Sequence, residues 1–128
     1  MPKTIVKPPG LWDPTPRAYS HGVRVGNLLF LAGQTGGDSS RRAAPGNFEA
    51  QTRQAFKNMQ AVLEAAGGSL DNLVTMTVFI TDMRFGDEFV RLRGEIHGRD
   101  FPASALIGVS HLAPPNALLE IQAIAALD

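Results

Sequence analysis

The residue best suited to chemistry is Glu120, which interrupts an apolar segment near the end of the sequence. Residues 118 to 127 are apolar except for Glu120 and Gln122, which fall on one side of a predicted strand. A carboxylate held on a strand and partly shielded from water can act as a general base or orient a water molecule. Alternatively, this side of the strand is solvated, or Glu120 pairs with a neighbouring cation.

Tyr19, the only tyrosine, is a second candidate. As a phenol in a cleft it would contact a substrate, whereas as a hairpin aromatic it would only pack on the core. The three histidines, His21, His97 and His111, are far apart and form no short-spaced ligand pair, so we expect no metal site.

Motifs for phosphate binding and for serine hydrolysis are missing. Gly33, Gly36 and Gly37 fit neither the dinucleotide fingerprint nor the phosphate loop, and turn glycines are the better interpretation. Ser110 lies in Gly-Val-Ser-His-Leu, which lacks the second glycine of a nucleophile elbow. These patterns argue against a nucleotide cofactor and against a serine hydrolase.

Composition excludes further classes. The 128 residues include no cysteine, which rules out disulfides and cysteine-ligated zinc, and we expect a cytoplasmic protein. Twelve basic residues balance twelve acidic ones, so no nucleic-acid partner is expected. The apolar runs are far shorter than the roughly 20 residues of a membrane span, so no membrane partner is expected.

The elements that would position these side chains follow from periodicity. Residues 1–17 are rich in proline and predict an extended arm, and residues 18–128 predict a single domain. Strands at 18–25 and 28–34 flank Gly26-Asn27, which suits a tight hairpin with Val25 opposite Leu28, Val23 opposite Phe30 and Tyr19 opposite Gln34. Further on we predict an exposed mobile loop (36–47), a helix from Phe48 to Ala66, a strand (74–81), a helix with the stripe Phe85, Phe89, Leu92 and Ile96, and strands at 103–110 and 118–127.

The resulting order, ββαβαββ, predicts an α+β fold. Its mixed sheet would carry both helices on one face and would need cover on the other. A partner subunit is the simplest cover.

Several strings in the sequence resemble the RidA/YjgF family, also known as reactive intermediate deaminases or L-PSP endoribonucleases. Nearly everything after residue 17 takes part in the resemblance. The strings are Ala18–Val23, Val25–Leu28, Phe30–Gln34, Gln51–Ala55, Val62–Gly67, Val78–Met83, Phe101–Ala103 and Leu119–Ala125.

This resemblance implies a chorismate-mutase-like fold and a homotrimer with clefts between subunits. Deaminases of the family hydrolyse enamines and imines, such as 2-aminoacrylate, to a keto acid and ammonia without metal or cofactor. Glu120 would orient the attacking water, and Tyr19 and Gly33 also match the family's site.

One position departs from the family pattern in a way that matters for substrate binding. Ser104 stands where the deaminases carry an arginine that clamps the substrate carboxylate, and a hydroxyl cannot supply that charge. Arg17, Arg41 and Arg42 are candidates to replace it. Two further departures are Val90, in place of a helix asparagine, and His21, in place of a common glutamine.

The leading hypothesis is therefore a RidA-type trimer whose inter-subunit cleft binds a small metabolite and hydrolyses an enamine, an imine or a related compound. One alternative is a ligand-binding or chaperone-like member without catalysis. Another is an endoribonuclease or translation inhibitor, against which the zero net charge argues.

Overall fold

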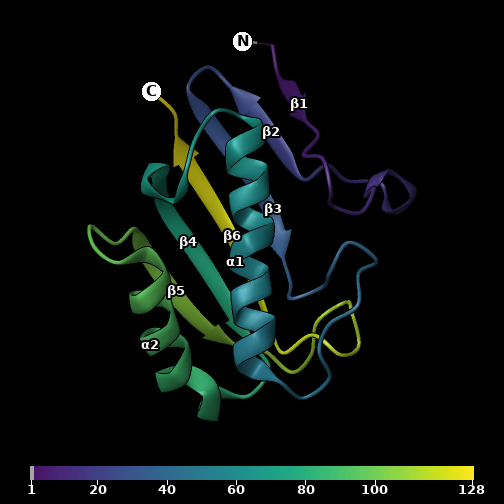
Figure 1. The fold of residues 1–128 in the computed structure, drawn as a ribbon, viewed down its shortest axis with the longest axis vertical. Helices are drawn as coiled ribbons and strands as arrows, with labels where there is room; N and C mark the ends of the chain where they lie inside the picture. The colour runs from purple at the N-terminus through teal and green to yellow at the C-terminus, as the bar shows by residue number, and fades with distance from the viewer. Residues whose placement is uncertain (1) are drawn as a thin grey trace.

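The computed structural model describes residues 2–128, so that Met1 of the predicted arm lies outside the described residues. The strands are β1 (Thr4–Val6), β2 (Gly22–Val25), β3 (Leu28–Gln34), β4 (Leu73–Ile80), β5 (Ala103–Gly108) and β6 (Leu119–Ala126), and the helices are α1 (Phe48–Ala65) and α2 (Gly86–His97). All six strands form one sheet in the order β1-β2-β3-β6-β4-β5 (Figure 1). Only β4 and β5 are parallel. The fold is therefore α+β, as predicted.

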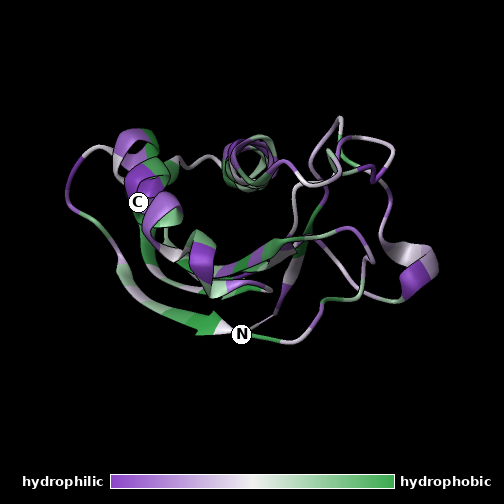
Figure 2. Cartoon of the chain, turned by 90° about the horizontal axis from the view of Figure 1, so that it is seen from below, coloured by the Kyte–Doolittle hydropathy of each residue, from purple (hydrophilic) through white to green (hydrophobic). Residues whose placement is uncertain are grey.

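Both helices cover the same face of the sheet, which Figure 2 shows with α1 seen end-on. The helix α1 begins after Asn47, whose side-chain oxygen accepts a hydrogen bond from the Ala50 N–H at 3.0 Å. Phe56 of α1 stacks on Phe89 of α2 with ring centroids 6.3 Å apart. The apolar side of α1 lies buried against the sheet through Ala55, Phe56, Met59, Val62 and Leu63.

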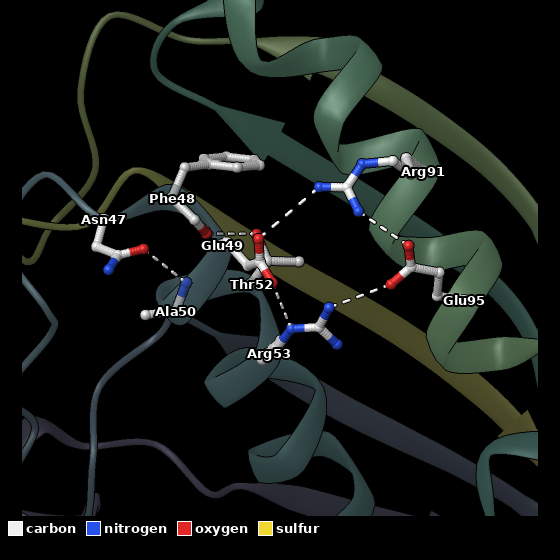
Figure 3. Close-up of polar contacts among 8 residues, drawn as sticks. All are labelled: Asn47, Phe48, Glu49, Ala50, Thr52, Arg53, Arg91 and Glu95. Atoms are coloured by element: carbon white, nitrogen blue, oxygen red, sulfur yellow. Dashed lines mark hydrogen bonds and ion pairs between the residues drawn. The ribbon is translucent and has the colours of Figure 1, made fainter.

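Charged side chains join the two helices on the side away from the sheet (Figure 3). Arg53 of α1 donates to Glu49 at 2.9 Å and to Glu95 of α2 at 3.1 Å. Arg91 donates to the other oxygen of Glu95 at 2.9 Å. These hydrogen bonds, from Arg53 first and then Arg91, lower the pKa of the Glu95 carboxyl. Because the side chains are about half exposed, each pair contributes little stability by itself.

The hairpin of β2 and β3 has the predicted register at its closed end, with Val25 opposite Leu28 and Val23 opposite Phe30. The first strand is shorter than the predicted 18–25. Ala18 adopts a left-handed φ of 63°, which turns the chain out of the strand, and β2 begins only at Gly22. The predicted pairing of Tyr19 with Gln34 is therefore wrong, and Gln34 pairs with β6 instead.

The proline-rich arm supplies a strand that its sequence did not predict. Thr4 pairs with Arg24 and Val6 with Gly22, so β1 is the antiparallel edge of the sheet beside β2. Val6 is buried against the core. The order ββαβαββ thus gains one short strand in front.

In the described part of the chain no helix covers the other face of the sheet, which we call the open face. Phe30 of β3 and Ile107 of β5 remain 42% and 41% exposed there. Glu120 belongs to the same face, because it pairs with Phe79, which in turn pairs with Ile107. Neither α1 nor α2, the helices of residues 2–128, combines the length and hydropathy that crossing a bilayer requires.

Candidate functional site

Three of the four candidate residues line one cavity, of about 310 Å³. Tyr19 comes from the segment between the arm and β2, Gly33 from the end of β3 and Glu120 from the start of β6. Loop residues from 36–47 and from the connection between β5 and β6 complete the wall. Ser104 does not line this cavity.

Glu120 is the second residue of β6 and lies partly buried in the cavity wall. The neighbouring Ile121 and Ala123 alternate with it and are buried beneath the helices. Burial raises the pKa of the Glu120 carboxyl above its ordinary value of 4.5. No other cause contributes, because no cation or hydrogen-bond donor among residues 2–128 contacts the carboxylate. Glu120 is thus a carboxylate of raised basicity that is open to a bound molecule.

Gly33 is required by the position of that carboxylate. A Cβ atom at Gly33 would lie 2.7 Å from Cδ and 2.8 Å from Oε1 of Glu120, closer than real side chains approach. The register of β3 against β6 shifts between Leu31 and Gln34, which brings the Gly33 backbone beside the acid. Only a glycine at position 33 leaves room for the Glu120 side chain in its present position.

A chain of hydrogen bonds fastens the arm to the sheet beside the cavity. The indole Nε1–H of Trp12 donates to the Tyr19 hydroxyl at 3.0 Å. Nε2 of the buried His21 lies 2.9 Å from the carbonyl oxygen of Trp12, and Nδ1 lies 3.0 Å from the side-chain nitrogen of Gln34. Because a carbonyl can only accept, Nε2 carries the proton of His21 and Nδ1 accepts from Gln34. His21 therefore serves as a structural link.

The same chain orients Tyr19. Its oxygen accepts from Trp12, so its own O–H remains available to donate into the cavity. The sequence analysis missed Trp12, which also lines the cavity. The sequence did contain a sign of this role. Tryptophan is highly buried on average, so the one tryptophan of the sequence indicates that the arm packs on the domain.

Two arginines line the cavity as well. Arg17 and Arg41 both do so, whereas Arg42 does not. The guanidinium carbon of Arg41 lies 5.7 Å from the centre of the Trp12 ring, a cation–π arrangement. Of the three arginines that could replace the charge absent at Ser104, two therefore share a cavity with Glu120.

Ser104 lies elsewhere, on β5 opposite Met76 of β4. Its hydroxyl oxygen accepts a hydrogen bond of 2.7 Å from Nη1 of Arg93, a residue of α2. The Arg93 guanidinium also lies 5.1 Å from the centre of the Phe89 ring, and partial burial lowers its pKa. A guanidinium therefore occupies the surroundings of Ser104, although it comes from the helix.

The histidines stay apart in the fold. His111 Nδ1 lies 3.1 Å from the hydroxyl of its neighbour Ser110, and the ring of His97 lies beside that of Phe101. In the part of the chain that the structure describes, no three His, Asp or Glu side chains gather as metal ligands would.

Comparison with known proteins identifies the family. The model of the family described as Endoribonuclease L-PSP matches residues 13–127. The chain belongs to this family. It is the family of YjgF and Rid proteins, which the sequence strings resemble.

Curated RidA/YjgF relatives match over most of their length. A RutC family protein of Pyrococcus horikoshii is 39% identical over 108 residues, covering 84% of this chain and 85% of the relative. The 2-iminobutanoate/2-iminopropanoate deaminase of Dermatophagoides farinae is 33% identical over 128 residues, covering 99% and 98%.

Solved RidA/YjgF structures share the fold. Yeast Mmf1 superposes with a TM-score of 0.90 at 28% identity, covering 99% of this chain and all of that one. RidA from an Antarctic Psychrobacter bacterium gives a TM-score of 0.82 at 33% identity, covering 86% and 89%. Both the resemblance and the α+β fold that it implied are thereby confirmed.

Proposed function

We propose that the cavity binds a small 2-imino acid, or its enamine tautomer, and hydrolyses it to a 2-oxo acid and ammonia. The observation that carries the proposal is Glu120, an unpaired and partly buried carboxylate facing a cavity beside Gly33 and the Tyr19 phenol. The name of the Dermatophagoides relative, an iminobutanoate and iminopropanoate deaminase, supports the same reaction class.

The reaction needs one base at a fixed place. Glu120 takes a proton from water as the oxygen forms a bond to C2 of the imine, the C=N electron pair moves to nitrogen, and nitrogen takes a proton from the solvent. The carbinolamine then collapses: protonated Glu120 returns its proton to the amino nitrogen, the O–H proton leaves to the solvent, the C=O bond forms, and the C–N bond breaks with its electron pair on nitrogen, which departs as ammonia. One water is consumed for each 2-oxo acid and ammonia released. The raised pKa of Glu120 makes this carboxylate a stronger base than an exposed one.

Tyr19 completes the arrangement. Its hydroxyl, held by the Trp12 indole, donates to a polar group of the bound substrate. Holding the substrate and Glu120 in one geometry is itself a large part of such catalysis.

The proposal includes a homotrimer with the cavities at its subunit interfaces. Support comes from the open face, where Phe30 and Ile107 are about two-fifths exposed and none of the described helices or strands covers them. A second copy of the chain would bury these side chains and would close the cavity against water.

A trapping assay tests the activity. An amino-acid oxidase generates 2-iminobutanoate or 2-iminopropanoate, and semicarbazide traps whatever imine persists. We expect the trapped fraction to fall in proportion to added protein, with matching release of 2-oxo acid and ammonia. A trapped fraction equal to that with heat-denatured protein would refute the deaminase and favour a member that binds ligands without catalysis.

A further inference from the structure

The cavity is lined by two arginines, Arg17 and Arg41, that form no salt bridge with any acidic side chain among residues 2–128. We propose that Arg17 and Arg41 together bind the carboxylate of the substrate and make the site selective for molecules with a single negative charge. The identity of that substrate rests on the proposed function, whereas the anion site itself does not.

Arg41 is held in place by a tightly bonded turn. One side-chain oxygen of Asp38 accepts from the backbone N–H groups of Ser40 and Arg42 at 2.8 and 2.9 Å. The N–H of Arg41 donates to the carbonyl of Asp38 at 2.8 Å. Arg41 itself has a φ of 64°, a conformation that costs energy for any residue other than glycine. Such strain persists where the surrounding structure enforces it, often at ligand sites.

Arg17 approaches from the arm. It ends the 3₁₀ turn Thr15–Arg17, and its N–H donates to the carbonyl of Pro14 at 2.9 Å. Asp13 fixes the start of the turn, because its carboxylate accepts from both the backbone and the side chain of Thr15. The two arginines therefore belong to separate, locally braced segments that meet at one cavity.

Neither guanidinium has an acidic partner among residues 2–128. Arg53, Arg84 and Arg91 each form an ion pair with a nearby carboxylate. The other arginines of residues 2–128 that form no ion pair lie outside the cavity, so Arg17 and Arg41 are distinguished by their position. Arg17 and Arg41 share their cavity with Glu120, yet no salt bridge joins them to it. Guanidinium groups left without an internal anion are suited to bind one from outside, and their paired donors match a carboxylate.

The charges of the cavity also indicate the charge of the ligand. With Glu120 as the carboxylate that the proposed reaction requires, the two guanidinium groups and this one acid leave a net charge of one positive unit. A single substrate carboxylate neutralises this charge, whereas a second carboxylate would lie near Glu120 without a partner. A volume of about 310 Å³ is at the small end of ligand pockets, which favours the same short monocarboxylates.

Titration calorimetry with three small molecules tests the proposal. The probes are 2-oxobutanoate with one charge, 2-oxoglutarate with two and 2-butanone with none. We expect the wild type to bind 2-oxobutanoate most tightly, and Arg17→Gln and Arg41→Gln each to weaken that binding about tenfold or more. Arg41→Lys, which keeps the charge but loses the paired donors, should recover part of the loss.

Two further variants serve as controls. Arg42→Gln removes the same charge from the same loop outside the cavity and should change the affinity less than about twofold. Arg93→Gln tests the other candidate anchor, beside Ser104, and should also leave binding nearly unchanged. Circular dichroism and sedimentation verify that every variant keeps its fold and assembly.

The outcomes separate this proposal from the deaminase. Arginine-dependent binding of 2-oxobutanoate without turnover of any imine would leave the anion site standing and refute the reaction. Efficient turnover that Arg17→Gln and Arg41→Gln do not impair would overturn the anion site alone. The anion site would also be refuted if Arg93→Gln abolished binding of 2-oxobutanoate, or if the wild type bound no 2-oxobutanoate at millimolar concentration.

Discussion

Gly33→Ala is a sharp test of whether the position of the Glu120 carboxylate matters. The new methyl group would lie 2.7 Å from Cδ of Glu120, whereas non-bonded carbon atoms rest about 3.5–4.0 Å apart. The carboxylate must therefore retreat by about 1 Å. A displacement of this size from the reacting position costs about 100-fold in rate. Because the displaced atoms end a side chain that faces a cavity, we expect a stability cost of only about 1 kcal/mol.

The measurement compares steady-state kinetics with thermal unfolding. We expect kcat to fall while KM changes little, because the anion site is untouched. Gly94→Ala is the matched control: it adds the same methyl group on α2, where no atom lies within 4 Å. That change should leave the rate unaltered and stabilise the helix by about 0.5–1 kcal/mol. A Gly33→Ala protein with the rate of the wild type would refute the assigned role of Glu120.

The remaining predictions concern the acid, the altered clamp position, the assembly and the helix network. Glu120→Gln should lower the rate about 100-fold or more while raising stability at neutral pH, since burial disfavours the charged form. The gain should shrink as the pH falls through the raised pKa of the wild-type acid and vanish below the ordinary value of 4.5, a shift that denaturant titrations at several pH values would detect. Ser104→Arg should fail to raise the rate, because it adds a second guanidinium beside Arg93; faster deamination in the trapping assay would contradict this. Sedimentation equilibrium at micromolar concentration should give a trimer, and a monomer would refute the proposed assembly. Glu95→Gln should lower the thermal midpoint at neutral pH. The difference in midpoint from the wild type should disappear as the pH falls below 4.5 and through the lowered pKa of Glu95. A constant difference across that range would exclude the ion pairs as its cause.

The sequence predicted those parts of the fold that depend on neighbouring residues. Gly26-Asn27 sets the hairpin turn, and the turn sets the register of the residues beside it. The strand β1 escaped prediction because three residues between prolines carry no periodicity, and only the edge of β2 gives them a partner. Ala18 ended the strand early because its left-handed conformation is imposed by the arm and not by its own side chain.

The site was less accessible to sequence reasoning, because its residues meet only through the fold. The pattern alone singled out Glu120, but the placement of Gly33 beside it depends on the shift in register of β3 against β6. The sequence alone could not distinguish the adjacent arginines Arg41 and Arg42 as candidates. The conformation of one turn decides which of them lines the cavity. Packing of α2 on the sheet likewise joins Arg93 to Ser104, eleven positions along the chain.

The central position of β6 has a consequence for how the protein folds during its synthesis. The strands β3 and β4 each pair with β6 and not with each other, so β6, the last described strand in the sequence, joins the two halves of the sheet. During synthesis, β1–β3 and β4–β5 must wait with unpaired edges until residues 119–126 emerge. Pairing across such long sequence separations is slow and leaves those edges open to aggregation. Because Glu120 belongs to this late strand, a nascent chain cannot form the cavity around this carboxylate before its sheet is complete.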